Sequence, residues 1–243
     1  WDAFVAFTVE LGLSGVEALS GIPGCVGASP IQNIGAYGQE VADTITRVEF
    51  LDYATHELEI LEAKDLGFGY RDSIFKRGKL GVVTWVEFEL NELPAALERL
   101  TEAVGKEVRT PAEIRNAVLE TRAQKGMVLS ETDFDTHSCG SFFTNPIVSF
   151  GFAATLPSEA PRWEQPDGSV KISAAWLIEN SGIGKGFKLG NSKASTSTKH
   201  CLAITNRGGA SADEVVELAR FIQTSVSNRF GINLVPEPNL IGF

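Results

Sequence analysis

The segment from Gly21 to Gly38, GIPGCVGASPIQNIGAYG, most constrains the fold, because it is rich in glycine and carries no charged residue. Glycine adopts backbone angles that other residues cannot and adds no side chain, so such a loop can approach a ligand closely. Successive backbone N–H groups in it can form a concave site for phosphate. The segment lacks the Lys-Ser/Thr ending of a P-loop and matches no Rossmann fingerprint. Composition alone leaves a structural loop and a cofactor-cradling loop equally open.

Around this segment the hydrophobic pattern predicts alternating strands and helices with no internal repeat. Two helices open with capping boxes, the first of them with proline at the first helical position, and they should end at Gly126 and before Gly231. The second should bury a face made of Val215, Leu218, Phe221 and Ile222. The safest interpretation is a mixed α+β organisation in two lobes. The expected elements are a helix over Asp2–Gly12, strands over Thr46–Asp52, Glu57–Glu62 and Gly81–Leu90, and helices beginning near Thr110–Glu113 and Ser211–Glu214.

Global properties exclude several classes. A chain of 243 residues can bury one large core or two modest ones. A formal net charge of −10 argues against nonspecific nucleic-acid binding, which needs a surplus of Lys and Arg. No apolar run approaches the roughly 18–20 residues of a membrane helix. Cys25, Cys139 and Cys201 are few and widely spaced, so we predict neither a disulfide framework nor a metal site, which suits a reducing cytoplasm.

Three short stretches contain candidate chemistry. In SCGSFFTNPIVS, Ser141 is either part of a turn entering a buried strand or a proton donor in an apolar pocket. In FGYRDSIFK, Arg71 could clamp a carboxylate with two parallel hydrogen bonds, although a surface Arg-Asp pair is the commoner arrangement. In LVPEPNLIGF, Glu237 stands between two prolines, as either a positioned acid or part of an extended terminus.

Together these stretches resemble a known family. The segments GIPGCVGASPIQNIGAYG, FGYRDSIFK, GSFFTNP and PEPNLIG occur in the order found in the UDP-N-acetylenolpyruvoylglucosamine reductases, the MurB flavoenzymes of peptidoglycan precursor synthesis. KGMVL at Lys125–Leu129 and PDGSVKISAAWLIE at Pro166–Glu179 extend the similarity over essentially the whole chain.

The resemblance implies a mechanism. NADPH reduces a bound FAD, and a hydride then passes to C3 of the enolpyruvyl ether of UDP-N-acetylglucosamine enolpyruvate, yielding UDP-N-acetylmuramate. Ser141 resembles the general acid that protonates C2, and Arg71 and Glu237 resemble the pair that stabilises the enolic intermediate. An arginine opposite a developing dianion in a water-poor site can contribute ~3–4 kcal/mol.

Further residues carry over from the family to positions of this chain. Arg122 and Lys125 are candidates for the substrate diphosphate, with a solvated helix terminus as the alternative. We expect a cytoplasmic monomer whose partners are small molecules, without nucleic acid or membrane insertion. Expected substrate-binding residues are Tyr70, Arg122, Lys125 and Asn145, and expected cofactor-binding residues are Pro23, Gly24, Gly27, Gln32, Asn33, Ile34 and Gly35.

The implied fold is an incomplete FAD-binding domain of the vanillyl-alcohol-oxidase type over residues 1–125 and a separate α+β substrate-binding domain over 126–230. A tail over 231–243 should return to the flavin side. Two features depart from the family: its N-terminal flavin-binding lobe is not found, and ELNELPAALERL, which follows TWVEF, contains no tyrosine to clamp the diphosphate. If the native chain lacks that lobe, the alternative function is that of a non-catalytic nucleotide-sugar-binding protein.

Overall fold

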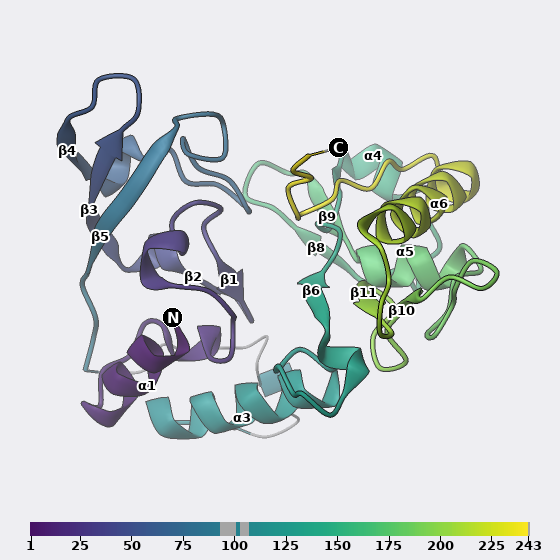
Figure 1. The fold of residues 1–243 in the computed structure, drawn as a ribbon, viewed down its shortest axis with the longest axis horizontal. Coiled ribbons are helices and arrows are strands. Elements are labelled where there is room, and N and C mark those ends of the chain that lie inside the picture. The colour runs from purple at the N-terminus through teal and green to yellow at the C-terminus, as the bar shows by residue number, and fades with distance from the viewer. Residues whose placement is uncertain (93–100, 103–106, 243) are drawn as a thin grey trace. The chain divides into compact units, whose positions relative to one another are not determined.

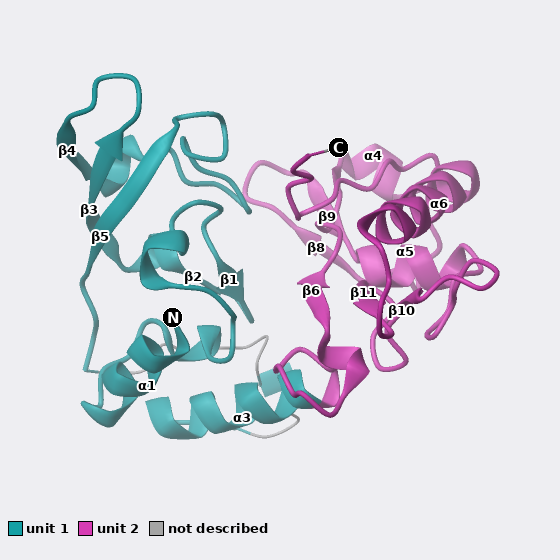
Figure 2. Ribbon diagram, viewed as in Figure 1, with its two compact units in different colours: residues 1–123 teal, residues 124–243 magenta. Residues whose placement is uncertain are grey.

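The protein consists of two compact units, Trp1–Ala123 and Gln124–Phe243 (Figure 2). The computed structural model describes residues 1–92, 101–102 and 107–242. Each unit has its own hydrophobic core and combines helices with antiparallel sheet (Figure 1). The α+β organisation predicted from the sequence is thereby confirmed, whereas the functional division at Lys125 stays a prediction.

The first unit is built on a three-stranded antiparallel sheet with the order β4-β3-β5. Its central strand is β3 (Ile45–Asp52), flanked by β4 (Leu58–Glu62) and β5 (Gly81–Phe88). These three strands confirm the sequence-based expectation to within two residues at each end. The other elements of this unit are α1 (Asp2–Glu10), η1 (Glu17–Leu19), η2 (Val26–Ala28), β1 (Gly35–Ala36), β2 (Gln39–Glu40), η3 (Val41–Asp43), η4 (Ala63–Asp65) and α3 (Pro111–Gln124).

Strand alternation explains which face of this sheet is buried. Val48 and Phe50 point into the core, with 0% and 1% of their surfaces exposed. Successive residues of a strand point to opposite faces, so Glu49 between them lies on the outer face, opposite Ile60 and Trp85. The core behind the sheet joins it to α1 and to the glycine-rich segment, because Val5 belongs to the same cluster as the two strand residues and Val26 and Ile31 pack against it.

Helix α3 begins at the predicted capping box. The Thr110 hydroxyl accepts a hydrogen bond from the Glu113 N–H at 3.2 Å, and the Glu113 carboxylate accepts one in return from the Thr110 N–H at 3.2 Å. This reciprocal pair satisfies N–H groups that have no partner inside the helix. The helix ends at Gln124, two residues before Gly126, whose φ of +68° lies in the left-handed region that glycine tolerates.

The second unit contains two three-stranded antiparallel sheets with the orders β10-β11-β6 and β7-β9-β8. Their strands are short, and several span only two or three residues. The elements of this unit are η5 (Phe134–Thr136), β6 (Ser138–Ser141), β7 (Ile147–Val148), α4 (Phe150–Ala153), β8 (Arg162–Glu164), β9 (Val170–Ile172), α5 (Ala174–Asn180), β10 (Ala194–Thr196), β11 (Ala203–Asn206) and α6 (Ala212–Phe230).

Helix α6 packs beside α5 and against the β10–β11 hairpin (Figure 1). It begins with the predicted capping box at Ser211 and ends before Gly231, whose φ is +69°. The predicted buried face was wrong in one position. Phe221 is 42% exposed and stacks on Phe187, with ring centroids 5.5 Å apart. The residues that the helix buries are Val216, Leu218, Ala219, Ile222 and Val226.

Among the described residues, no helix is both long and apolar enough to cross a membrane. The segment Glu89–Leu100, in which the sequence lacks the family's tyrosine, falls largely on residues 93–100, outside the described part of the chain. The expectation about a tyrosine clamp therefore stays a prediction.

Candidate active site

Ser141 ends strand β6, directly after an irregularity in its pairing with β11. Ser141 lies opposite Ala203, and Ser138 lies opposite Thr205, so Cys139 and Gly140 together face one residue of β11. This two-against-one arrangement is a β-bulge, a feature that re-aims the side chains beside it. Gly140 supports it with a φ of +73°. The sequence predicted a turn here; the structure has a bulged strand, with the Ser141 side chain half-buried at its end.

The two phenylalanines after Ser141 anchor this strand in the core of the second unit. Phe142 and Phe143 are 3% and 1% exposed, and their ring centroids lie 5.2 Å apart at an interplanar angle of 64°. The backbone N–H of Phe142 donates to the Leu202 carbonyl at 2.8 Å, which continues the ladder beyond Ser141. The rings and the ladder together fix the backbone that carries the serine.

Glu237 is brought to the same place by main-chain pairing. Its N–H donates to the Phe142 carbonyl at 2.9 Å, and the Thr144 N–H donates to the Val235 carbonyl at 3.0 Å. Phe143 and Pro236 form the antiparallel bridge between these two bonds. The structure thus places two of the three predicted catalytic residues together, with Glu237 bonded to the residue that follows Ser141.

The predicted substrate residues are divided between the two units. Lys125 is half-buried at the start of the second unit. Asn145 lies in the same unit, where its side-chain oxygen accepts the Ala174 N–H at 2.9 Å at the first residue of α5. Arg122 belongs to the first unit, and its Nη2 donates to the Gly21 carbonyl at 3.4 Å. Burial lowers the pKa of the Arg122 guanidinium.

Positive charge gathers around Lys125 within the second unit. Burial, followed by the charge of Lys125, lowers the pKa of His200 to about 4, with a further contribution from Lys185 and an opposing one from Glu179. His200 is therefore neutral near pH 7, and the charges that act on it are those of Lys125, Glu179 and Lys185. Sequence reasoning did not single out His200 or Lys185; the signals were GKG at 184–186 and KH at 199–200.

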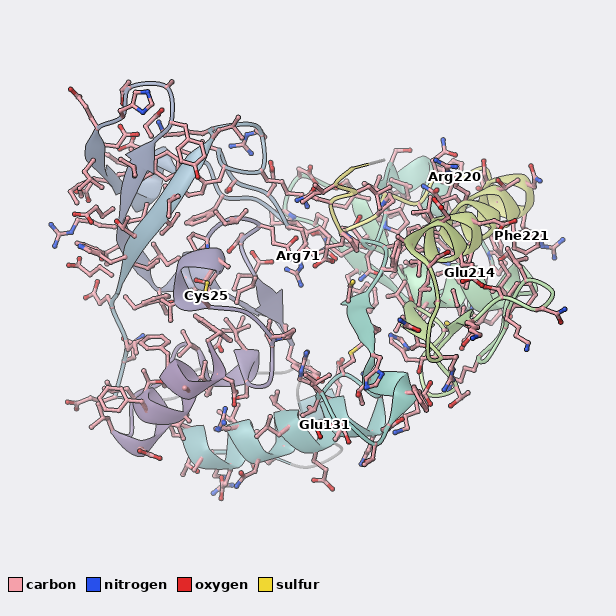
Figure 3. All side chains as sticks on the ribbon, in the orientation of Figure 1. Cys25, Arg71, Glu131, Glu214, Arg220 and Phe221 are labelled. Carbon is pink, nitrogen blue, oxygen red and sulfur yellow. The ribbon has the colours of Figure 1, made fainter. Side chains whose placement is uncertain are left out.

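In the first unit, Arg71 is held against the β1–β2 hairpin (labelled in Figure 3). Its guanidinium donates to the Gly35 carbonyl and, at 3.4 Å, to the Asn33 carbonyl, and its Nη1 lies 3.7 Å from the Glu40 carboxylate. The Arg71 guanidinium also lies over the Tyr70 ring, 5.2 Å from its centroid. The side chain is only 16% exposed. Glu40 is a partner that the sequence did not reveal.

The backbone of Arg71 adopts a φ of +53°, in the left-handed region. For a residue with a Cβ this conformation costs roughly 1–2 kcal/mol. Such residues persist where surrounding contacts impose them, and they are frequent at functional sites. The bonds from the guanidinium to the hairpin carbonyls are contacts of this kind.

The glycine-rich segment contains all the predicted cofactor residues, and the structure gives several of them a packing role. The Asn33 side chain donates to Glu40 at 2.7 Å and to the Gly69 carbonyl at 2.9 Å, and accepts the Ala42 N–H at 3.0 Å. A Cβ at Gly27 would lie 2.9 Å from the Val83 carbonyl oxygen. Of the others, Gly35 also packs closely, Gln32 and Ile34 are half-buried, and Pro23 and Gly24 are exposed.

Gly24 differs from these packed positions. Its φ is +123°, and a Cβ built there would meet nothing within 4 Å. Compared with Gly27 and Gly35, Gly24 therefore leaves more room for a ligand to approach the backbone. The structural interpretation therefore holds for the packed positions, whereas a cofactor-cradling role of the segment stays a prediction.

Comparison with known proteins places this geometry in a family. A reductase from Leifsonia xyli is 47% identical to this chain, over 100% of this chain and 75% of the relative. The chain belongs to the UDP-N-acetylenolpyruvoylglucosamine reductase family. The family's C-terminal domain model matches residues 132–241.

Other members show the same relationship. The UDP-N-acetylenolpyruvoylglucosamine reductase of Mycobacterium tuberculosis is 48% identical, over 100% of this chain and 71% of that one. The crystal structure of the family member MurB from Thermus caldophilus matches 98% of this chain and 68% of its own, with a TM-score of 0.64 at 29% identity. The resemblance inferred from the sequence motifs is thereby confirmed, and the fold agrees with it over nearly the whole chain.

Proposed function

We propose that the native protein uses NADPH and FAD to reduce UDP-N-acetylglucosamine enolpyruvate to UDP-N-acetylmuramate in peptidoglycan precursor synthesis. Family membership supports the substrate class. The observation that carries the proposal is the pairing that brings Glu237 to the backbone beside Ser141. We further propose that the protein acts as a cytoplasmic monomer; its three cysteines are free thiols, in accord with a reducing compartment.

The residues of the first unit fit an FAD-binding domain of the vanillyl-alcohol-oxidase type. Exposed Gly24 offers side-chain-free backbone to a ligand, while Gly27 and Gly35 hold the segment against the sheet and the hairpin. Pro23, Gln32, Asn33 and Ile34 complete the proposed cofactor-binding set. The chemistry supplied by a bound FAD is hydride transfer from NADPH to C3 of the enolpyruvyl group.

Ser141 is the proposed donor of the proton that C2 of the substrate requires. A hydroxyl is a weak acid toward water, but it can protonate a strongly basic enolate when it is held within hydrogen-bond reach. The bulge before Ser141 and the buried rings after it provide that fixed placement.

Arg71 and Glu237 are the proposed stabilisers of the enolic intermediate. The Arg71 guanidinium is held in place by hairpin carbonyls before any substrate binds, so little reorganisation is needed when negative charge develops. Glu237 is fixed through its own backbone N–H rather than through its carboxylate. Its side chain is half-buried, as expected for an acid that works partly shielded from water.

Lys125 is the proposed ligand of the substrate diphosphate, with Tyr70 and Asn145 as further contacts. The positive field that Lys125 and Lys185 impose on His200 supports an anion site at this point of the second unit. For Arg122 the bond to the Gly21 carbonyl favours holding the glycine-rich segment over direct contact with the diphosphate.

The half-reactions of the native protein test this proposal. In anaerobic stopped-flow measurements, Ser141→Ala should leave flavin reduction by NADPH nearly unchanged, because that step does not involve C2 of the sugar. Reoxidation by the enolpyruvyl substrate should slow by ~10²–10⁴, the usual contribution of a positioned general acid. Ser141→Cys should retain more activity than alanine, because a thiol can still donate a proton. Reoxidation within about tenfold of wild type would remove Ser141 from the mechanism. Substrate binding without NADPH oxidation by the wild type would favour the non-catalytic alternative.

A further inference from the structure

Asp135 lies in the turn η5, six positions before Ser141, and its carboxylate gathers donors from two other segments. Oδ1 accepts the Thr198 N–H at 2.7 Å and Arg207 Nη2 at 2.8 Å. Oδ2 accepts the Thr198 hydroxyl. The residue is 5% exposed. None of the proposed catalytic or substrate contacts uses this buried charge.

The donors to Asp135 lie on either side of strand β11 in the chain. Thr198 opens the turn that leads from β10 into β11, and Arg207 follows the last residue of β11. The turn is also braced from within, because the Ser197 hydroxyl accepts the Lys199 N–H at 3.0 Å. Arg207 is fixed to β10 as well, through its Nε bond to the Ser195 hydroxyl at 3.1 Å. One carboxylate therefore holds both the turn that precedes β11 and the residue that follows it.

This anchoring determines how β6 can lie on β11. Asp135 belongs to the segment that leads into β6. Its bonds to the turn before β11 and to the residue after β11 therefore fix how many residues lie between this anchor and Ser141. The bulge at Cys139 and Gly140 takes up the extra residue. Because side chains alternate along a strand, loss of that residue from the bulge would turn the Ser141 side chain to the opposite face.

We propose that Asp135 is a positioning residue for the reductase reaction: it locks the register of β6 on β11 and thereby aims the Ser141 hydroxyl. This role rests on the proposed function of Ser141, whereas the register lock itself does not. Asp135 also abuts the residue after Lys125, because a Cβ at Gly126 would lie 3.1 Å from the Asp135 carbonyl oxygen.

The charge state of Asp135 agrees with this role. Burial opposes ionisation of the carboxyl, but hydrogen bonds from Thr198 and Ser197 and the charge of Arg207 outweigh it and hold its pKa below the usual range. The carboxylate is thus ionised at neutral pH, and Thr198 and Arg207 alone donate three hydrogen bonds to it, a number that the single oxygen of an asparagine cannot match.

Amide hydrogen exchange on the native full-length protein tests the lock without using the reaction. In Asp135→Asn, exchange over 138–142 and 203–207 should accelerate by on the order of tenfold or more, the effect of losing charge-assisted bonds. Asp167→Asn is the matched control, because the exposed Asp167 carboxylate accepts hydrogen bonds from Ser169 within the turn between β8 and β9. If Asp135→Asn does not fold, Thr198→Val removes only the hydroxyl donor and should give the same pattern at smaller amplitude.

The half-reactions then separate positioning from general support of the fold. Flavin reduction by NADPH should be unchanged in Asp135→Asn, while reoxidation by the enolpyruvyl substrate should fall by about tenfold to a hundredfold with little change in KM. Asp167→Asn should match wild type in both. Unchanged exchange over β6 and β11 would overturn the proposal. Accelerated exchange with equal losses in both half-reactions would show a purely structural role. If the wild type shows no reductase activity but exchange over β6 and β11 still accelerates in Asp135→Asn, the proposed function is overturned, whereas the role of Asp135 in fixing the register of β6 on β11 is supported.

Discussion

Lowering the pH should destabilise the protein through one side chain, His200. Burial and the charge of Lys125 lower its pKa from 6.5 to about 4 in the folded state. The unfolded chain therefore binds more protons than the folded one between these pH values, and stability rises with pH across this window. Above pH 6.5, the pKa of the histidine in the unfolded chain, His200 does not lower the free energy of unfolding. Below pH about 4, its pKa in the folded state, His200 lowers the free energy of unfolding by the full difference between the two pKa values. At 1.36 kcal/mol for each pH unit, that difference is ~3 kcal/mol.

Urea unfolding of wild type and His200→Gln, measured at several pH values between about 4 and about 7, checks this magnitude. Carboxyl groups with lowered pKa values, such as Asp135, also lose their stabilisation in acid, but they are common to both proteins and cancel in the difference. The free energy of unfolding of His200→Gln, minus that of wild type, should rise by ~3 kcal/mol when the pH is lowered from the upper to the lower end of this range. His56→Gln, in the exposed turn between β3 and β4, is the control and should show no such trend. If the difference in free energy of unfolding between wild type and His200→Gln stays constant with pH, the reasoning is refuted.

Two substitutions test the packing of the hairpin and the substrate clamp. A Cβ at Gly35 would lie 2.8 Å from a hairpin carbonyl and 3.0 Å from Arg71 Nη1, so Gly35→Ala should lower stability by ~1–3 kcal/mol in thermal unfolding and slow the reductase. Gly151→Ala, where the new Cβ meets nothing within 4 Å, should do neither, and equal behaviour of the two would contradict the packing argument. Lys125→Ala should raise the KM for the sugar nucleotide much more than it lowers kcat, as expected for uniform binding, with exposed Lys64→Ala as the control. Equal losses in kcat and kcat/KM would instead place Lys125 in the chemistry.

The long elements could be predicted from the sequence because their signals are local. The capping boxes at Thr110 and Ser211 and the glycines after each helix lie within one turn of the helix ends. The short strands of the second unit carry no such signal, because two or three residues are too few to show a period of two. Their pairing depends on partners far along the chain, such as Ser141 and Ala203.

The candidate site likewise contains residues that can be predicted from the sequence and residues that cannot. Ser141, Arg71 and Glu237 stand in motifs that can be recognised as written. The residues that hold these side chains in place cannot be recognised in this way. Asp135 binds Thr198 and Arg207 across long sequence separations. Arg71 adopts a left-handed backbone conformation that its residue type does not predict. The Phe221 error is related: helical periodicity marks a face, but whether another element covers each position is decided by tertiary packing.

The pairing of the tail with the strand after Ser141 has a consequence for the order of folding. Thr144 and Val235 are hydrogen-bonded although they are 91 residues apart in the chain. Closing such a loop costs conformational entropy that must be met before the contact contributes any stability. Local helices such as α6 can form much earlier. A refolding chain would therefore regain its circular dichroism before Glu237 reaches its place, and catalytic activity would return last.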